Sequence, residues 1–251
     1  DKEAMKRATS VYLVDRTIPM LPERLCNFIC SLRPDEEKLA YSVIFNIDEN
    51  ADIKTYRIVH TVIKSDRRYA YEEVQQLLED NGVVDGTGEP APPAPKGGYK
   101  GENADNLIML DKLAKKLREK RFKNGAVKFD REELHFDVDE QGKPVRAYFK
   151  RSKDANKLIE EFMLLANRTV AESVGRPKDG RAPKTLPYRV HDNPDPQKLE
   201  TLREFIMKFG YKLKTTSTKG ETSRSLNKLM DEVAGKREQN LIETIALRAM
   251  M

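Results

Sequence analysis

Two segments of the chain alternate apolar and polar residues in the pattern of a β-strand. The runs 38–47 and 53–63 are rich in β-branched and aromatic residues, and the polar tip Asp48-Glu49-Asn50-Ala51-Asp52 separates them. This arrangement predicts a β-hairpin. Similar but shorter patterns predict further strands at 10–14 and within 127–149.

Other segments repeat their apolar residues with a helical period. The strongest is 103–122, an amphipathic pattern whose apolar side is formed by Leu107, Leu110, Leu113, Ala114 and Leu117. A second strong helix is expected at 154–173, with Asp154 as its N-cap. Shorter helices are expected up to residue 9 and at 71–80, 196–209, 222–234 and 237–250. Together the elements predict an α+β fold, in which a mixed or antiparallel sheet is flanked by long helices.

Residues 82–101 follow neither period and are rich in proline and glycine. Such a composition predicts a segment that buries too little surface to order itself, and so a flexible insertion in a single domain spanning 1–251. The segment contains Gly86-x-Gly88, but prolines and not a helix follow it. The pattern therefore does not match a phosphate-binding loop.

The composition is that of a well-solvated protein, with 38% hydrophobic and 35% charged residues and no apolar run long enough to span a membrane. No signal peptide opens the chain, and Cys26 and Cys30 are spaced for neither a zinc knuckle nor a redox pair. We therefore expect reduced thiols and a cytoplasmic protein. The net charge of +5 permits nucleic-acid binding, and residues 112–123 concentrate seven basic residues against one acid. A run of this kind is either a solvated helix face or a surface for phosphate contacts.

The segment 9–23 joins a short strand pattern to the two prolines Pro19 and Pro22. Proline fixes its own φ angle and biases the preceding residue toward an extended conformation, so two prolines three residues apart make a stiff corner. Such a corner can fix the directions of neighbouring side chains, here those of Tyr12 and Arg16.

Tyr12 lies between Val11 and Leu13, and strand alternation points it to the face opposite these two apolar residues. It can therefore cover the edge of the sheet or serve as a platform for a nucleic-acid base, a contact worth about 1–3 kcal/mol. The local sequence leaves both interpretations open.

The corner carries a family resemblance. The run Thr9-Ser10-Val11-Tyr12, the later Ile18-Pro19-Met20-Leu21-Pro22-Glu23 and the end Cys30-Ser31-Leu32 resemble one motif of the ribonuclease II/ribonuclease R exoribonucleases, the RNB family. In that family the Tyr of the motif is one of two aromatics that clamp the 3′-terminal nucleotide. The resemblance thus implies that Tyr12 binds RNA, while Arg16 orients the turn or meets a phosphate.

Two more segments match the family. Gly125-Ala126-Val127-Lys128-Phe129 fits its "GA…F" motif, which implies that Phe129 is the second clamp, whereas Phe136 alternates like a core residue. The helix containing Glu160 and Glu161 fits an "IEE.M..AN" pattern that lies over the active site. Glu161 falls nearer the centre of the apolar face, where a carboxylate needs a partner or a ligand. The resemblance implies that Glu161 contacts the terminal nucleotides; the alternative is a solvated charge.

The chain lacks the carboxylate cluster, of the form D-x5-D-x-D-D, with which the family holds Mg²⁺ for hydrolysis. It also lacks the arginine-bearing "SPIRRYPDL" run, and the family order would place the two motifs before Asp1 and after Met251. His60, His135 and His191 have no ligand partners at helical spacing, so no metal site is expected. We expect the central fragment of an RNB domain, with no catalytic residue of its own.

As the resemblance implies, the intact protein is a Mg²⁺-dependent 3′→5′ exoribonuclease that hydrolyses single-stranded RNA to nucleoside 5′-monophosphates. The fragment alone is predicted to be inactive. The alternative is a homologue of the same family that has lost its carboxylates and acts in RNA binding or as a scaffold.

Overall fold

The structure is a computed structural model that describes residues 2–128, 132–177, 180–189, 193–214 and 219–250. The helices are α1 (Lys2–Arg7), α2 (Tyr71–Asp80), α3 (Ala104–Lys123), α4 (Asp154–Gly175), α5 (Pro196–Met207), α6 (Lys219–Val233) and α7 (Gln239–Ala249), with a π-helical turn, η1 (Arg24–Ile29). The strands are β1 (Val11–Tyr12), β2 (Thr17–Ile18), β3 (Glu37–Ile47), β4 (Ile53–Lys64), β5 (Glu132–Val138) and β6 (Pro144–Arg151). They pair as three two-stranded antiparallel sheets, and the predicted α+β fold is confirmed.

The long hairpin β3–β4 has the predicted polar tip. Both carboxylate oxygens of Asp48 are used there: Oδ1 accepts hydrogen bonds from the backbone amides of Asn50 and Asp52, each 2.9 Å, and Oδ2 lies 2.8 Å from Lys54 Nζ. Lys54, followed by these amides, lowers the pKa of Asp48 to about 2. The acidic tip is therefore a turn stabilised by its own side chain.

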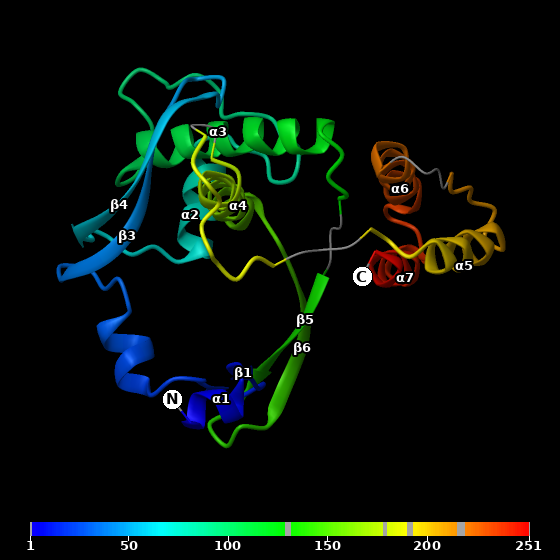
Figure 1. Ribbon diagram of the computed structural model, residues 1–251, viewed down its shortest axis with the longest axis horizontal. Coiled ribbons are helices and arrows are strands. Elements are labelled where there is room, and N and C mark those ends of the chain that lie inside the picture. Colours follow the sequence, from blue (N-terminus) through cyan, green and yellow to red (C-terminus); the bar gives the residue numbers. More distant parts are fainter. Residues whose placement is uncertain (1, 129–131, 178–179, 190–192, 215–218, 251) are drawn as a thin grey trace.

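Helices α2, α3 and α4 pack on one another beside this hairpin (Figure 1). Their core contains Leu78 of α2 and Ile108 of α3, both fully buried, together with Val83 and Ala91 from the segment 82–101. The expectation that this segment buries too little to order itself is thus wrong for its two apolar anchors. Its flexibility and its status as an insertion stay predictions.

Helix α3 forms where predicted, but it turns a different face to the core. The buried positions are Ala104, Ile108, Asp111 and Ala114, while Leu110 is exposed. The hydrophobic pattern excludes Asp111 from a core face, yet Asp111 is buried because Lys115 pairs with it at 2.7 Å. A polar pair inside the core therefore rotates the helix relative to its leucine stripe.

The start of α4 also differs from the prediction. Lys153 and not Asp154 precedes the first helical turn, and the buried Asp154 carboxylate turns toward Lys115 of α3 at 3.3 Å. The backbone amide of Asp154 instead donates to the side chain of Asp85, at 3.0 Å. An acid that could have capped its own helix thus joins two helices.

Helices α5, α6 and α7 form a separate group with its own hydrophobic core (Figure 1). Leu202, Ile206, Leu226 and Ile242 are fully buried in it. No helix in the described part of the chain is long and apolar enough to cross a membrane.

The N-terminal corner is smaller than predicted. The expected strand at 10–14 shortens to β1, which pairs with β2 around a tight turn closed by a 2.8 Å hydrogen bond from Leu13 N to Arg16 O. Two further bonds fasten the corner: Arg7 Nη1 donates to Pro19 O at 2.8 Å, and Met20 N donates to Ser10 Oγ at 3.0 Å. The stiffness inferred from the prolines is thus reinforced by hydrogen bonds to α1 and to the strand.

We predict that the two cores respond to mutation independently. Leu202→Ala should destabilise the α5–α7 group by about 2–5 kcal/mol, because it removes buried apolar surface and leaves a cavity. Native-state amide hydrogen exchange should then speed up in α5, α6 and α7 and stay unchanged in α2, α3 and α4. Ile108→Ala is the matched reciprocal variant, and equal acceleration in both groups for either variant would contradict two separate cores.

Candidate nucleic-acid interface

Tyr12 projects into solvent from β1. Its side chain belongs to no buried cluster, and the residue is 79% exposed. This excludes a core role in the structure and leaves the whole ring face available for stacking. The backbone of Tyr12 is held by its pairing with Thr17 in β2, so the ring leaves the surface from a fixed point.

Arg16 lies at the other end of the same turn and pairs with its neighbour Asp15. Its Nε and Nη2 lie 2.7 and 2.5 Å from Asp15 Oδ2. This hydrogen bond is the main cause of the lowered pKa of Asp15. Arg16 therefore stabilises the turn, while its largely exposed side chain keeps donors available.

Glu161 is buried on α4, as the helical period predicts. It is 3% exposed, whereas the neighbouring Glu160 side chain is 45% exposed. Arg121 of α3 is its partner: Arg121 Nε lies 3.1 and 3.2 Å from the two oxygens of Glu161, and Nη2 lies 2.5 Å from Oε1. The same guanidinium reaches Glu160 Oε1 at 3.2 Å. The buried carboxylate thus has the partner that its position demands, and the pair ties α3 to α4.

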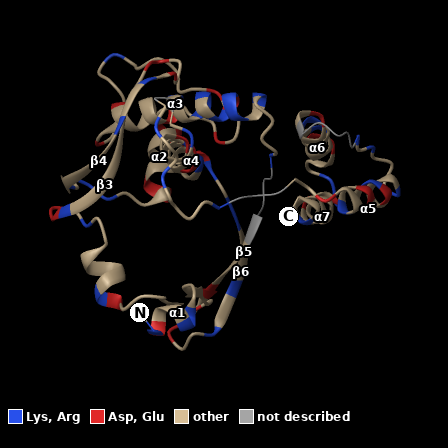
Figure 2. Ribbon diagram, viewed as in Figure 1, with Lys and Arg blue, Asp and Glu red and all other residues tan. Residues whose placement is uncertain are grey.

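The basic run 112–123 covers the C-terminal half of α3 (Figure 2). Six of its seven cations bind groups of the protein itself: Lys112 to Tyr99, Lys115 to Asp111, Lys116 to the Glu49 carbonyl, Lys120 to the hairpin tip, Arg121 to Glu161 and Lys123 to Glu119. The seventh, Arg118, pairs with no acid of the described residues; its guanidinium lies 5.3 Å from the centroid of the Phe122 ring. The run is therefore mainly an internal fastening, and only Arg118 fits the interpretation as a phosphate-binding surface.

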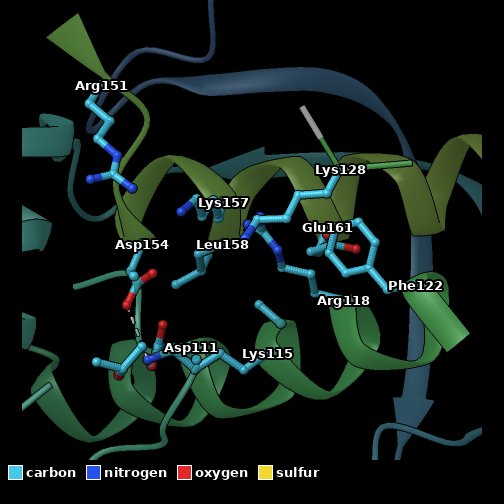
Figure 3. A pocket seen from close by; sticks show the side chains of 14 residues that line it. Asp111, Lys115, Arg118, Phe122, Lys128, Arg151, Asp154, Lys157, Leu158 and Glu161 are labelled. Atoms are coloured by element: carbon cyan, nitrogen blue, oxygen red, sulfur yellow. Dashed lines mark hydrogen bonds and ion pairs between the residues drawn. The ribbon is translucent and has the colours of Figure 1, made fainter. Parts of the chain in front are cut away.

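A cavity of about 230 Å³ lies between α3 and α4 (Figure 3). The loop Gly86-Thr87-Gly88 lines one side of it, although its sequence does not match a phosphate-binding loop. At one end the buried acids Asp111 and Asp154 share Lys115. Burial raises the pKa of Asp111 against the opposing effect of Lys115. Oxygen Oδ2 of Asp154 accepts no hydrogen bond from the described residues, and its contact is the ion pair with Lys115.

The rest of the cavity is positively charged. Its lining includes Arg118, Lys128 and Lys157, none of which pairs with an acid in the described part of the chain, and the ring of Phe122. Figure 3 shows these cations pointing into the cavity from different elements. An anionic or phosphate-bearing ligand suits such a lining. Sequence analysis missed Lys128 and Lys157 because they come from separate segments and form no local motif.

The structure does not bring all the predicted site residues together. Tyr12 and Arg16 lie at the corner near α1, while Glu161 lies on α4, beyond the β5–β6 hairpin (Figure 1). Phe129 lies outside the described residues. Among the described residues, no group of three or more His, Cys, Asp or Glu side chains is placed to hold a metal ion.

Comparison with known proteins gives a consistent family. The RNB domain profile matches residues 1–251. Ribonuclease R of Aquifex aeolicus is 37% identical over 257 residues, which cover 100% of this chain and 33% of that protein. The structure of Mycoplasma genitalium RNase R in complex with ribose methylated single-stranded RNA matches with a TM-score of 0.80 at 26% identity, covering 100% of this chain and 36% of that chain.

Yeast Ssd1, a pseudonuclease, has the same fold, with a TM-score of 0.66 at 19% identity over 99% of this chain and 27% of its own. The chain spans about a third of the length of the curated relatives it matches. The domain profile covers every residue of the chain, and the corner motif, the exposed Tyr12 and the Glu161 helix all lie within it. This chain therefore belongs to the RNB-domain family of exoribonucleases.

Proposed function

We propose that this chain is the central part of the catalytic domain of a 3′→5′ exoribonuclease, which hydrolyses single-stranded RNA to nucleoside 5′-monophosphates. The observation that carries the proposal is the exposed ring of Tyr12 on a corner fastened by hydrogen bonds, within a sequence that matches the RNB domain throughout. A relative solved with single-stranded RNA, RNase R of Mycoplasma genitalium, supports RNA as the ligand. Cys26 and Cys30 are free thiols, which suits a reducing compartment such as the cytoplasm.

The proposed reaction needs Mg²⁺, and the described residues do not fit a site for it. No suitable cluster of ligands is present among them, and the two acids that approach each other, Asp111 and Asp154, already hold Lys115. We therefore assign the metal ligands, and with them the hydrolytic step, to carboxylates that this chain does not contain.

The residues of this chain would bind and orient the RNA end. Tyr12 would stack on a terminal base, and Phe129 would provide the second aromatic face of the clamp. Glu161 would accept a hydrogen bond from a terminal nucleotide, since a carboxylate has about four acceptor positions and Arg121 occupies only part of them. Arg16 would hold the turn that presents Tyr12.

The chain alone should not hydrolyse RNA. Incubated with Mg²⁺ and end-labelled single-stranded RNA, it should release no nucleoside monophosphate, because it lacks the metal-binding aspartates. The intact protein is the control and should shorten the same RNA from its 3′ end. Degradation by the chain alone, abolished by Tyr12→Ala, would contradict this assignment, and an intact protein that binds RNA without cutting it would favour the non-catalytic homologue.

In the intact protein, Tyr12→Ala should remove a stacking interaction worth about 1–3 kcal/mol. Its removal should alter the length of the final product or the turnover rate more than the overall affinity for RNA, since the rest of the strand is still held. Product lengths on a sequencing gel and RNA affinity by anisotropy measure the two effects.

Tyr12→Phe keeps the ring and should behave like the wild type. Tyr41→Ala removes another exposed tyrosine, on β3, and is the matched control. Product lengths that are unchanged in Tyr12→Ala would exclude Tyr12 as a clamp.

The Arg121–Glu161 pair allows structural and functional effects to be separated. Arg121→Ala should destabilise the protein by about 3 kcal/mol in urea unfolding, because it leaves a buried carboxylate without its partner. Glu160→Gln, at the exposed neighbour of Glu161, should cost below about 1 kcal/mol.

Glu161→Gln keeps the shape of the side chain and removes its charge. If Glu161 orients the terminal nucleotide, this variant should lower kcat in the intact protein at a temperature where it is fully folded. A Glu161→Gln protein with altered unfolding but normal kcat and product length would limit Glu161 to joining the two helices.

A further inference from the structure

Two cavities of the structure meet at the same pair of cations. The first is the α3–α4 cavity; the second, of about 500 Å³, lies against the turn between α6 and α7. Lys128 and Arg151 line both cavities. The two cavities are therefore adjacent and open onto one continuous positively charged surface. We call this surface the cationic track, and its cations are Arg118, Lys157, Lys128, Arg151, Lys236 and Arg237.

The acids of the first cavity do not cancel this charge. Asp111 and Asp154 are paired with Lys115, and Glu161 is paired with Arg121. Each acid is thus neutralised by a cation outside the track, and the field of the track cations is left for a ligand.

The second cavity also has more cations than acids. Its acidic residues are Asp231 and Glu243, against four cations of the track. Glu243 is buried and accepts a 2.9 Å hydrogen bond from Gln239 Nε2. Arg237 is exposed and forms no ion pair with the described residues.

Lys128, at the junction, is held by its backbone. Its amide donates to Asn227 Oδ1 at 2.8 Å, and Asn227 Nδ2 donates to the Ala126 carbonyl, also at 2.8 Å. Between them Val127 packs against the core of the α5–α7 group. One α6 asparagine thus binds the segment on both sides of Val127 and fixes the root of the Lys128 side chain, while Lys128 itself stays exposed.

We propose that the cationic track binds the phosphate backbone of single-stranded RNA and leads the strand past Lys128 toward Glu161. The proposal rests on the proposed function for the identity of the polyanion. Spaced cations beside an aromatic ring, here Phe122, are what a flexible strand of phosphates and bases requires. The track adds phosphate contacts to the predicted base contacts of Tyr12 and Phe129, and it uses residues that no family motif includes.

The salt dependence of RNA binding tests the track directly. For single strands, the slope of log affinity against log salt concentration changes by about 0.7 for each phosphate that the protein neutralises. In the intact protein, with Mg²⁺ chelated to stop hydrolysis, Lys128→Ala and Arg237→Ala should each reduce the slope for a labelled oligoribonucleotide by about this amount. Lys128→Arg keeps the charge and should restore the slope.

The matched controls remove a cation from the same neighbourhood but outside the track: Lys123→Ala on α3 and Lys228→Ala on α6. They should leave the slope unchanged. If the wild type binds and degrades RNA but the track variants have the slope of the controls, the track is wrong and the proposed function stands. If the controls reduce the slope as much as the track variants do, the effect is one of net charge and the track is again wrong. A wild-type protein that neither binds nor degrades RNA overturns both proposals.

Discussion

Lys115 connects three parts of the N-terminal core. From α3 it binds Asp111 at 2.7 Å on its own helix, Asp154 at 3.3 Å at the start of α4, and the carbonyl of Glu89 at 2.9 Å in the preceding loop. Two buried carboxylates are costly unless a cation and hydrogen bonds compensate them. The separation of α3 from α4 therefore depends on this one ammonium group, and so do the cavity between them and the position of Glu161.

The same logic explains the basic run of α3. Most of its cations hold the tip of the β3–β4 hairpin, the loop before α3 or the acids of α4. A cation with a partner inside the protein contributes little to binding phosphate, because its charge is already compensated. The residues suited to RNA are those that the fold leaves without an acid partner, and these are spread over α3, α4 and the segment that ends at Lys128.

The elements with a clear local period are also those that the sequence predicts well. The β3–β4 hairpin and helix α3 lie close to their expected bounds, because alternation and helical spacing are properties of neighbouring residues. The buried face of α3, the position of Asp154 and the packing of Val83 and Ala91 depend on partners far along the chain. For that reason periodicity alone misassigns them.

The candidate site divides along similar lines. The family resemblance singles out Tyr12 and Glu161, and the structure agrees with what the period says of each, an exposed ring and a buried carboxylate. It also supplies Arg121, which no motif indicates, because a partner on another helix leaves no local pattern. Lys128 and Arg151 are missed for the same reason: only the folded chain brings them to one surface.

The β5–β6 hairpin connects the two parts of the site. Its turn lies beside the Tyr12 corner, where Gly142 comes close to Asp15, and its other end reaches Arg151 at the cationic track. An isolated two-stranded hairpin is marginally stable in water, so its ends must be held by other elements. Lys150 Nζ provides one such contact, 2.9 Å from Glu72 Oε1 on α2. A base clamp at Tyr12 and a carboxylate on α4 can act on one RNA strand only if this hairpin keeps them in register, and the anchoring of its two ends is thus part of the binding site.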